Sequence, residues 1–238
     1  MEKLIIGAKK LGLELSERQI EQFATYYQEL IDWNQRVNLT RITDYAEVQL
    51  KHFLDALTVT LACPDHIVGA ETRLIDVGTG AGIPGLPLKI MFPNLRLVLL
   101  DATAKKAVFL EHIKQKLGLD DVKIVVGRAE EVAHLSEYRE GFDIVLSRGV
   151  AQLSTLVELT LPFCAIGGSF IAQKKGAIDP EISQATKAIS TLGGNLREIK
   201  KIDLEEFSDE RYLVTIDKVA PTPSEYPRRP GIPAKRPL

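Results

Sequence analysis

The sequence predicts an α/β fold in which a largely parallel, doubly wound sheet follows an N-terminal helical segment. From about residue 72 onward, short apolar runs alternate with amphipathic stretches, the order typical of parallel strands joined by helices. The run 95–101 is almost continuously apolar, as expected for a strand covered on both faces. In the stretch 74–85, LIDVGTGAGIPG, an apolar run reaches Asp76 and then passes into a glycine-rich turn.

The composition is that of an ordinary folded protein with room for one α/β domain and a smaller appendage. Of 238 residues, 45% are hydrophobic and 26% are charged, and the net charge is −2. The chain has no excess of basic residues that would indicate nucleic-acid binding, although a local basic face can still bind RNA. Cys63 and Cys164 fit neither a disulfide framework nor a zinc site, which favours a reducing, cytoplasmic compartment. No run suits a signal peptide or a membrane span, so we expect no membrane role and no metal.

The N-terminal segment is predicted to be helical. Ser16 and Gln19 have the spacing of a capping box, and an apolar face follows between residues 20 and 31. A further helix is expected over 44–61, beginning at an aspartate cap. Pro64 prevents its continuation, because proline cannot donate to the hydrogen-bond ladder.

The sheet is expected to contain seven strands. Five apolar runs predict strands at 73–77, 95–101, 122–127, 142–147 and 168–174. Helices are expected between and after them at 86–92, 103–118, 153–164 and 179–192, with Gly118 as a C-cap. The last two strands, 196–204 and 211–219, are predicted to pair as an antiparallel hairpin at the sheet edge.

The chain is predicted to have three parts. These are a helical extension over 1–65, the α/β domain over 66–220 and a tail over 221–238. The tail is basic and so rich in proline that no regular structure is expected in it.

The glycine turn predicts a ligand site. In a doubly wound sheet, ligands bind at the carboxyl ends of the strands, where side chains at Gly78, Gly80 and Gly82 would fill the ligand's space. Asp101 ends the next strand, and a carboxylate there can accept both hydroxyls of a ribose. Nicotinamide cofactors and S-adenosylmethionine share that ribose. The G-x-G-x-x-G spacing alone is also compatible with a tight turn that binds nothing.

Asp76 favours S-adenosylmethionine over a nicotinamide cofactor. A nicotinamide site must hold a doubly anionic pyrophosphate beside this position, and a carboxylate would repel it. S-adenosylmethionine has no phosphate and carries a sulfonium and an ammonium group. Asp76 either contacts the cofactor or bonds the amides of the turn, and both alternatives fit a methyltransferase better.

The sequence resembles the S-adenosylmethionine-dependent methyltransferases, whose first motif is similar to DVGTGAG at 76–82. Within them the whole chain resembles the bacterial ribosomal RNA small subunit methyltransferase G family, also called glucose-inhibited division protein B. The segments that carry this resemblance are LIDWNQRVNLTRIT (30–43), HFLDAL (52–57), DVGTGAGIPGLPL (76–88), LLDATAKKAVFL (99–110), GRAEE (127–131), SRGVAQLSTLVELTLP (147–162) and YPRRPGIPAKRPL (226–238).

The resemblance implies a seven-strand, Rossmann-like methyltransferase fold and a specific reaction. S-adenosylmethionine would give its methyl group to N7 of a guanine in 16S ribosomal RNA, leaving S-adenosylhomocysteine. The substrate would be the small ribosomal subunit or an assembly intermediate, and the enzyme a cytoplasmic monomer. The family's cofactor contacts carry over to Gly78, Ile83, Ala129, Glu130 and Arg148.

Further cofactor contacts are expected next to these positions. Ala102 and Thr103 follow Asp101 directly, although the family often has Ser-Leu there. Other departures from the family are Thr79 and Ala56, where serine is common, and Ile83, where phenylalanine is common. Glu130 is expected to recognise the adenine amine; the alternative is a solvated residue in the first turn of a helix.

The chemistry needs no general base, because guanine N7 has a free lone pair and no proton. Most of the catalysis can come from alignment of the reactants, so we assign no catalytic residue. Arg148 follows the fourth strand and is the candidate for positioning cofactor or RNA. The alternative is a surface arginine paired with an acid.

Candidate RNA-binding residues come from three places in the chain. His52 and Asp55 lie one helical turn apart and form either an ordinary helix pair or part of the pocket. Lys174 and Lys175 end a predicted strand. In the tail, an aromatic residue beside two cations suits single-stranded RNA, although the tail can equally be a structural strap. The tail candidates are Tyr226, Arg228 and Arg229.

Two other classes of function stay open on the residues alone. One is a nicotinamide-dependent oxidoreductase, against which Asp76 and the absence of a proton-relay residue after the fourth strand count. The other is a non-enzymatic RNA- or ribosome-binding module that retains a cofactor fold.

Overall fold

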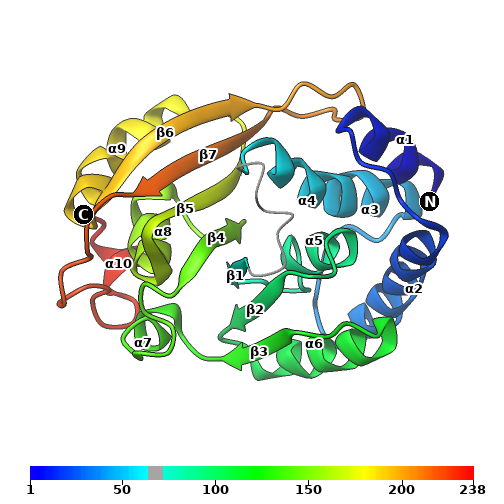
Figure 1. The fold of residues 1–238 in the computed structure, drawn as a ribbon, viewed down its shortest axis with the longest axis horizontal. Helices are drawn as coiled ribbons and strands as arrows, with labels where there is room; N and C mark the ends of the chain where they lie inside the picture. Colours follow the sequence, from blue (N-terminus) through cyan, green and yellow to red (C-terminus); the bar gives the residue numbers. More distant parts are fainter. Residues whose placement is uncertain (64–71) are drawn as a thin grey trace.

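The computed structural model describes residues 1–63 and 72–238 (Figure 1). Its centre is one seven-stranded sheet with the order β3-β2-β1-β4-β5-β7-β6. The strands are β1 (Arg73–Val77), β2 (Arg96–Asp101), β3 (Val122–Val126), β4 (Phe142–Arg148), β5 (Cys164–Lys175), β6 (Gly194–Lys201) and β7 (Arg211–Lys218). The first five pair in parallel, and β7 is antiparallel to both of its neighbours. The predicted fold class and the terminal hairpin are confirmed.

Helices cover both faces of this sheet (Figure 1). The helical elements before the sheet are α1 (Glu2–Lys10), α2 (Glu17–Asn34), α3 (Tyr45–Val48), η1 (Gln49–Leu54), α4 (Asp55–Leu57) and η2 (Thr58–Leu61). Those between and after the strands are α5 (Gly85–Met91), α6 (Ala104–Leu117), α7 (Ala129–Val132), α8 (Leu153–Thr160), η4 (Leu161–Phe163), α9 (Asp179–Thr191) and α10 (Ile232–Lys235).

The predicted N-terminal helix starts are confirmed. The Ser16 hydroxyl accepts a hydrogen bond from the Gln19 amide, and the Gln19 side chain accepts one from the Ser16 amide, which completes the capping box. Asp44 accepts from the Glu47 amide at 2.9 Å and begins a helical stretch that reaches Leu61. This stretch is π-helical over Gln49–Leu54. The expected stop at Pro64 lies outside the described residues.

Neighbouring residues of β1 belong to different hydrophobic clusters. Leu74 belongs to the same cluster as Leu4 and Phe23 of the N-terminal helices, whereas Ile75 belongs to that of Leu156 in α8. This alternation follows from the two-residue period of a strand, and it shows that the helical extension shares a core with one face of the sheet. The three-part division of the chain stays a prediction, and its first boundary, 65/66, lies outside the described residues.

Two local expectations were wrong. The helix expected over 153–164 ends at Thr160, and Cys164 is the first residue of β5. Pro162 lacks the N–H group that would continue the helix, and a short 3-10 turn takes its place.

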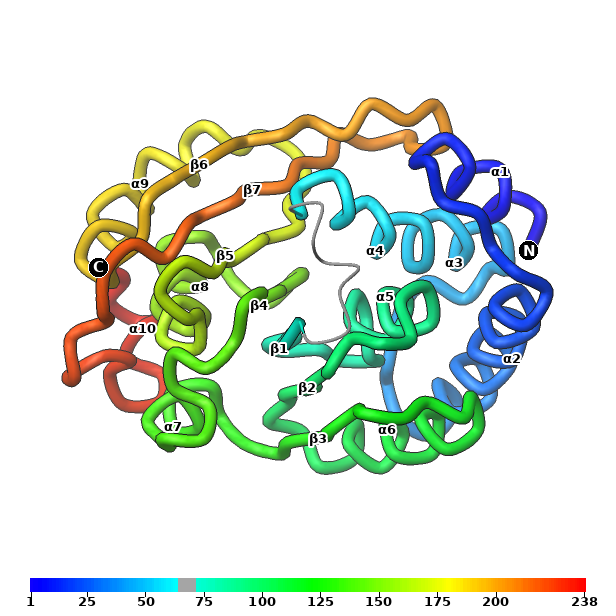
Figure 2. Tube along the Cα trace, viewed as in Figure 1, coloured from blue at the N-terminus to red at the C-terminus, as the bar shows by residue number. Residues whose placement is uncertain are grey.

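The tail also forms regular structure. It contains the one-turn helix α10, whose Pro233 occupies a first-turn position that needs no N–H donor. Figure 2 shows the tail returning beside α7 and α8, at the opposite end of the molecule from α1 and α2.

Candidate active site

The glycine turn after β1 requires its glycines. Gly78, Gly80 and Gly82 have φ angles of 73°, 62° and 88°, a region that L side chains rarely adopt. A Cβ at Gly78 would lie 2.4 Å from Cγ2 of Val150, so the backbone also needs the space. The Gly80 amide donates to Asp101 Oδ2 at 3.0 Å, which ties the turn to the end of β2.

Asp76 lies fully buried beneath this turn. Its Oδ2 accepts hydrogen bonds from the Thr79 hydroxyl at 2.7 Å and from the Gly85 amide at 2.9 Å. Its Oδ1 is buried and has no partner among the described residues. Burial raises the pKa of Asp76 to about 6. The bonds to the turn are therefore present, and Thr79 keeps the hydroxyl that makes one of them.

A cavity of about 110 Å³ opens at the carboxyl ends of β1, β2 and β3. Predicted cofactor residues that line it are Gly78, Asp101, Ala102, Ala129 and Glu130. Each oxygen of Asp101 accepts one backbone N–H, from Gly80 and from Thr103. Gly80, Gly82, Ile83 and Thr103 belong to the surrounding turns and do not line the cavity, and Ile83 is buried in the core.

Glu130 is buried, and the alternative of a solvated helix residue is wrong. Its Oε1 accepts hydrogen bonds from the Gly231 amide at 3.0 Å and from the Arg128 guanidinium at 3.2 Å. Burial opposes ionisation, but bonds from its own backbone amide, Gly231 and Arg128 outweigh it and lower the pKa of Glu130. The C-terminal tail thus reaches the wall of this cavity, a contact that sequence reasoning missed.

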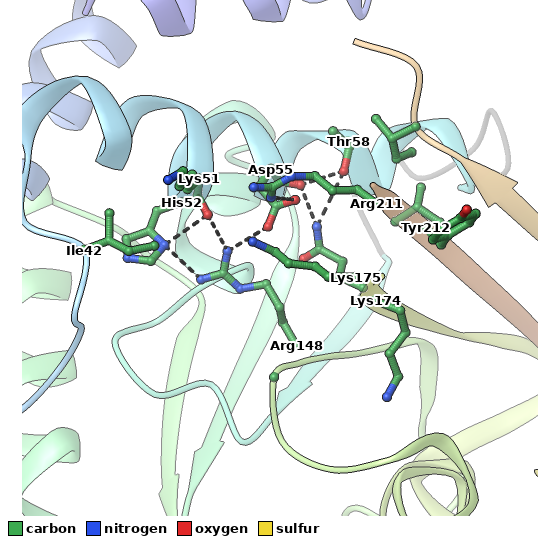
Figure 3. A pocket seen from close by; sticks show the side chains of 14 residues that line it. Ile42, Lys51, His52, Asp55, Thr58, Arg148, Lys174, Lys175, Arg211 and Tyr212 are labelled. Carbon is green, nitrogen blue, oxygen red and sulfur yellow. Dashed lines mark hydrogen bonds and ion pairs between the residues drawn. The ribbon is translucent and has the colours of Figure 1, made fainter. Parts of the chain in front are cut away.

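A larger cavity of about 340 Å³ lies between the η1–α4 stretch and the ends of β4, β5 and β7 (Figure 3). Arg148 forms part of its wall, and its side chain is 18% exposed. Its Nη1 donates to the Lys51 carbonyl at 3.0 Å and to Asp55 Oδ2 at 2.9 Å, and its Nη2 lies 3.2 Å from His52 Nδ1. His52 and Asp55 therefore both contact Arg148. Arg148 is paired with an acid and also lines this cavity, not the smaller one beside the glycine turn; its role in positioning cofactor or RNA stays a prediction.

Sequence reasoning missed two members of this cluster. Arg211, at the start of β7, is only 2% exposed, and its Nη1 lies 2.5 Å from Asp55 Oδ1. Gln173, at the end of β5, donates from Nε2 to the Asp55 carbonyl at 2.5 Å. In the sequence both lie in ordinary strand patterns, and only the order of the sheet brings β4, β5 and β7 to this place.

His52 is neutral in this environment. Burial and the positive charge of Arg148 lower the pKa of His52 to about 4. Nδ1 lies 3.2 Å from Arg148 Nη2, which can only donate, and 3.1 Å from the Lys51 carbonyl, which can only accept, so a neutral ring bonds one of the two through Nδ1. Nε2 lies 2.7 Å from the Thr40 hydroxyl, which can donate or accept.

The lowered pKa of His52 predicts a loss of stability in acid. The unfolded chain binds a proton near pH 6.5 and the folded chain only near pH 4, so stability falls as the pH drops between these values. The full effect is about 3 kcal/mol at about 1.4 kcal/mol per pKa unit. Asp76 acts in the opposite sense between about pH 4 and 6, because its folded pKa is raised.

Comparison of variants separates the two groups. We expect the His52→Gln protein to lose less stability than the wild type between pH 6.5 and pH 4, as measured by urea unfolding. Equal losses in the two proteins would show that His52 does not titrate in this way.

The remaining RNA-binding candidates differ in the exposure and the bonding of their side chains. Lys174 donates to the Ala151 carbonyl at 2.8 Å and to Glu181 at 2.9 Å, and its side chain is 10% exposed. Lys175 is 46% exposed, pairs with Asp209 at 3.1 Å and lines the larger cavity.

In the tail, only one of the two neighbouring arginines is exposed. Arg228 binds the fully buried Glu158 through Nε at 2.9 Å and Nη2 at 2.6 Å, whereas Arg229 is exposed. The Tyr226 carbonyl accepts from Arg139 at 2.9 Å, and its ring packs against the core. At Arg228 and Tyr226 the tail has the geometry of a strap.

Residues 1–63 and 72–238 contain neither a candidate metal-ligand cluster nor a helix suited to span a membrane. No group of three or more histidine, cysteine, aspartate or glutamate side chains there could hold a metal ion. No helix in this part of the chain has the length and apolar character needed to cross a membrane.

Solved structures of low sequence identity share the fold. M. jannaschii TYW2 in complex with AdoMet superposes with a TM-score of 0.51 and 14% identity over 64% of this chain and 72% of that one. The YcgJ protein from Bacillus subtilis gives a TM-score of 0.52 and 16% identity over 69% of this chain and 98% of that one.

Sequence relatives are much more similar. Proteins named ribosomal RNA small subunit methyltransferase G are 52% identical in Dehalococcoides mccartyi and 50% identical in Roseiflexus castenholzii, over the full length of both chains. The one from Lactobacillus johnsonii is 45% identical over 96% of this chain and 95% of its own. The family model for rRNA small subunit methyltransferase G (GidB) matches residues 19–211. The chain therefore belongs to the rRNA small subunit methyltransferase G family.

Proposed function

We propose that this protein transfers a methyl group from S-adenosylmethionine to N7 of a guanine in 16S ribosomal RNA. The observation that carries the proposal is the left-handed glycine turn beside a cavity that is lined by Asp101 and Glu130. The relatives' names state a small-subunit rRNA methyltransferase, and the TYW2 structure of the same fold holds AdoMet. We further propose a cytoplasmic monomer that acts on the small subunit or an assembly intermediate.

The residues present fit this cofactor. Each Asp101 oxygen uses one lone pair on a backbone amide, and Lys106 lies 3.6 Å from Oδ2, so lone pairs remain for the ribose hydroxyls. Ala129 and Glu130 line the part of the cavity beyond β3, where an amide and a carboxylate would recognise adenine. The buried, unpartnered Oδ1 of Asp76 adds negative potential beneath the turn, which suits a sulfonium and an ammonium group.

We propose that Val150 moves when a whole cofactor binds. Ligand pockets for molecules of this size occupy roughly 300 Å³ or more, and the cavity beside Gly78 measures about 110 Å³. Val150 lies over Gly78, is 40% exposed and follows Gly149, whose φ is 67°. Its displacement would join the cavity to the space above the glycine turn.

The protein's part in the reaction is to hold and align the reactants. When bound, the cofactor supplies an electrophilic methyl group on its sulfonium. Because guanine N7 carries no proton, no side chain has to remove one. Alignment and exclusion of water can lower the barrier by several kcal/mol. The residues assigned to alignment are those at the ends of β1, β2 and β4.

The cofactor site is tested by a pair of glycine variants. Gly80 and Gly118 have φ angles of 62° and 60°, and a Cβ at either would meet no atom closer than 4.0 Å. Gly80→Val and Gly118→Val therefore carry similar backbone strain. We expect only Gly80→Val to lose S-adenosylmethionine binding, by at least about tenfold, because its side chain enters the ligand's space.

Isothermal titration calorimetry with S-adenosylmethionine and with NAD gives the readout. Equal cofactor affinities in the two folded variants would remove the glycine turn from the site. Binding of NAD in place of S-adenosylmethionine would contradict the proposed reaction.

A further inference from the structure

We propose that the larger cavity receives the target guanine and that Arg148 recognises its O6 carbonyl. This inference rests on the proposed function and names the part of the substrate that the second cavity binds. Its basis is the position of the cavity, the character of its walls and the hydrogen-bonding state of Arg148.

The two cavities adjoin at the loop after β4. Gly149 lines the larger cavity, and the next residue, Val150, lines the smaller one beside Gly78. Since β1 and β4 are neighbours in the sheet, their carboxyl ends lie side by side. A base in the larger cavity therefore lies next to the proposed methyl donor.

The walls of the larger cavity suit a purine. Its volume of about 340 Å³ lies in the range of small-molecule pockets, roughly 300–1,000 Å³. Ile42, Ile202 and Leu213 provide apolar surface for the faces of a ring, and Arg148 and Lys175 provide cationic groups. A base must leave its stack to enter such a pocket, as in other enzymes that modify bases.

Arg148 is held firmly and still has donors to offer. Nη1 uses its two N–H groups on the Lys51 carbonyl and Asp55, and Nη2 lies 3.2 Å from His52 Nδ1 (Figure 3). Among the described residues, no acceptor is bound to Nε or to the second N–H of Nη2. Nε–H and one N–H of Nη2 lie on the same edge of a planar guanidinium. Three contacts to neighbouring groups thus present a fixed edge of donors at the cavity wall.

This donor edge distinguishes guanine from adenine. Beside N7, guanine has the O6 acceptor, whereas adenine has an amino group that only donates. Arg148 can bond O6 and would face an unfavourable donor in adenine. A bond to O6 also leaves the N7 lone pair free for the methyl group. Arg148 is therefore assigned as a residue that selects and orients the base.

The test uses base analogues at the target position. Small subunits are reconstituted with 16S rRNA that carries guanosine, inosine or 2-aminopurine there, and single-turnover methylation is measured with cofactor and subunit saturating. Inosine keeps O6 and N7, and 2-aminopurine keeps N7 but lacks O6. For the wild type we expect inosine to react within a few-fold of guanosine, and 2-aminopurine at least about tenfold more slowly.

The Arg148 variants then show whether this residue causes the difference. In Arg148→Ala, we expect the guanosine rate to fall and its ratio to the 2-aminopurine rate to approach one, because the lost contact is already missing in the analogue. Arg148→Lys keeps the charge without the planar fork and should also reduce the ratio. The matched control is Arg18→Ala, an exposed arginine of α2, which should keep the wild-type ratio.

The outcomes separate this inference from the proposed function. A wild-type ratio in folded Arg148→Ala, or in Arg148→Lys if the alanine variant does not fold, would overturn the assignment of Arg148. An equally fast reaction of guanosine and 2-aminopurine in the wild type would overturn recognition of O6. Failure of the wild type to methylate guanosine, or to bind S-adenosylmethionine, would instead contradict the proposed function.

Discussion

Replacement of Asp55 by alanine is expected to lower the free energy of unfolding by about 3 to 5 kcal/mol. The Asp55 carboxylate is 5% exposed and contacts two arginines, Arg148 through Oδ2 and Arg211 through Oδ1. Its removal leaves the guanidinium of Arg211, 2% exposed, beside that of Arg148 without the buried anion between them, and only the partly exposed Asp209 still pairs with Arg211 among the described residues. A buried charge that has lost its partner destabilises the fold far more than a broken surface pair. Urea unfolding at neutral pH measures the loss.

Asp209 offers a matched control for this variant. It contacts the same arginine, with Oδ1 2.9 Å from Arg211 Nη2, but it is 40% exposed. We expect Asp209→Ala to cost less than about 1 kcal/mol, because water screens an exposed pair. Similar losses for Asp55→Ala and Asp209→Ala would show that burial of the carboxylate does not govern its contribution.

Arg228→Ala is expected to cost about 3 kcal/mol of stability and to weaken cofactor binding. Glu158 is fully buried, and after this change the backbone amide of residue 228 is its only remaining donor among the described residues. The same tail brings the Gly231 amide to Glu130, so release of the tail also removes a hydrogen bond at the wall of the cofactor cavity. Urea unfolding and calorimetric titration with S-adenosylmethionine measure the two effects.

The adjacent arginine serves as the control. Arg229 is exposed, and we expect Arg229→Ala to change stability by less than about 0.5 kcal/mol. The double variant Arg228→Ala with Glu158→Ala should recover part of the loss, because it removes the buried charge along with its partner. A single Arg228→Ala variant as stable as Arg229→Ala would show that the tail is not strapped through Glu158.

The sequence alone determined the features that depend on local chain properties. The strand positions follow from runs of apolar residues, and the capping box at Ser16 and the C-cap at Gly118 follow from short-range spacing. The glycine turn was predictable because its left-handed backbone admits little else. Much of the lining of the smaller cavity was also predictable, because its residues follow strands whose carboxyl ends must lie together.

Local signals failed where two of them compete. The apolar run 153–164 is compatible with a helix throughout, and its proline ends the helix early and allows β5 to begin at Cys164. The prolines of the tail predict no regular structure, yet a proline in the first turn is compatible with a helix.

Only the tertiary structure decided what the charged residues do. Arg228 and Arg229 are neighbours with the same side chain, but one binds Glu158, 70 residues away in the chain, and the other is exposed. Arg148 bonds Asp55, 93 residues away in the chain, and the Gly231 amide bonds Glu130, 101 residues away. The charge of a residue and the periodicity around it do not predict such partners, because the order of the sheet and the path of the tail bring them together. Whether a cation is held by a buried carboxylate or left free for RNA therefore follows from its place in the fold.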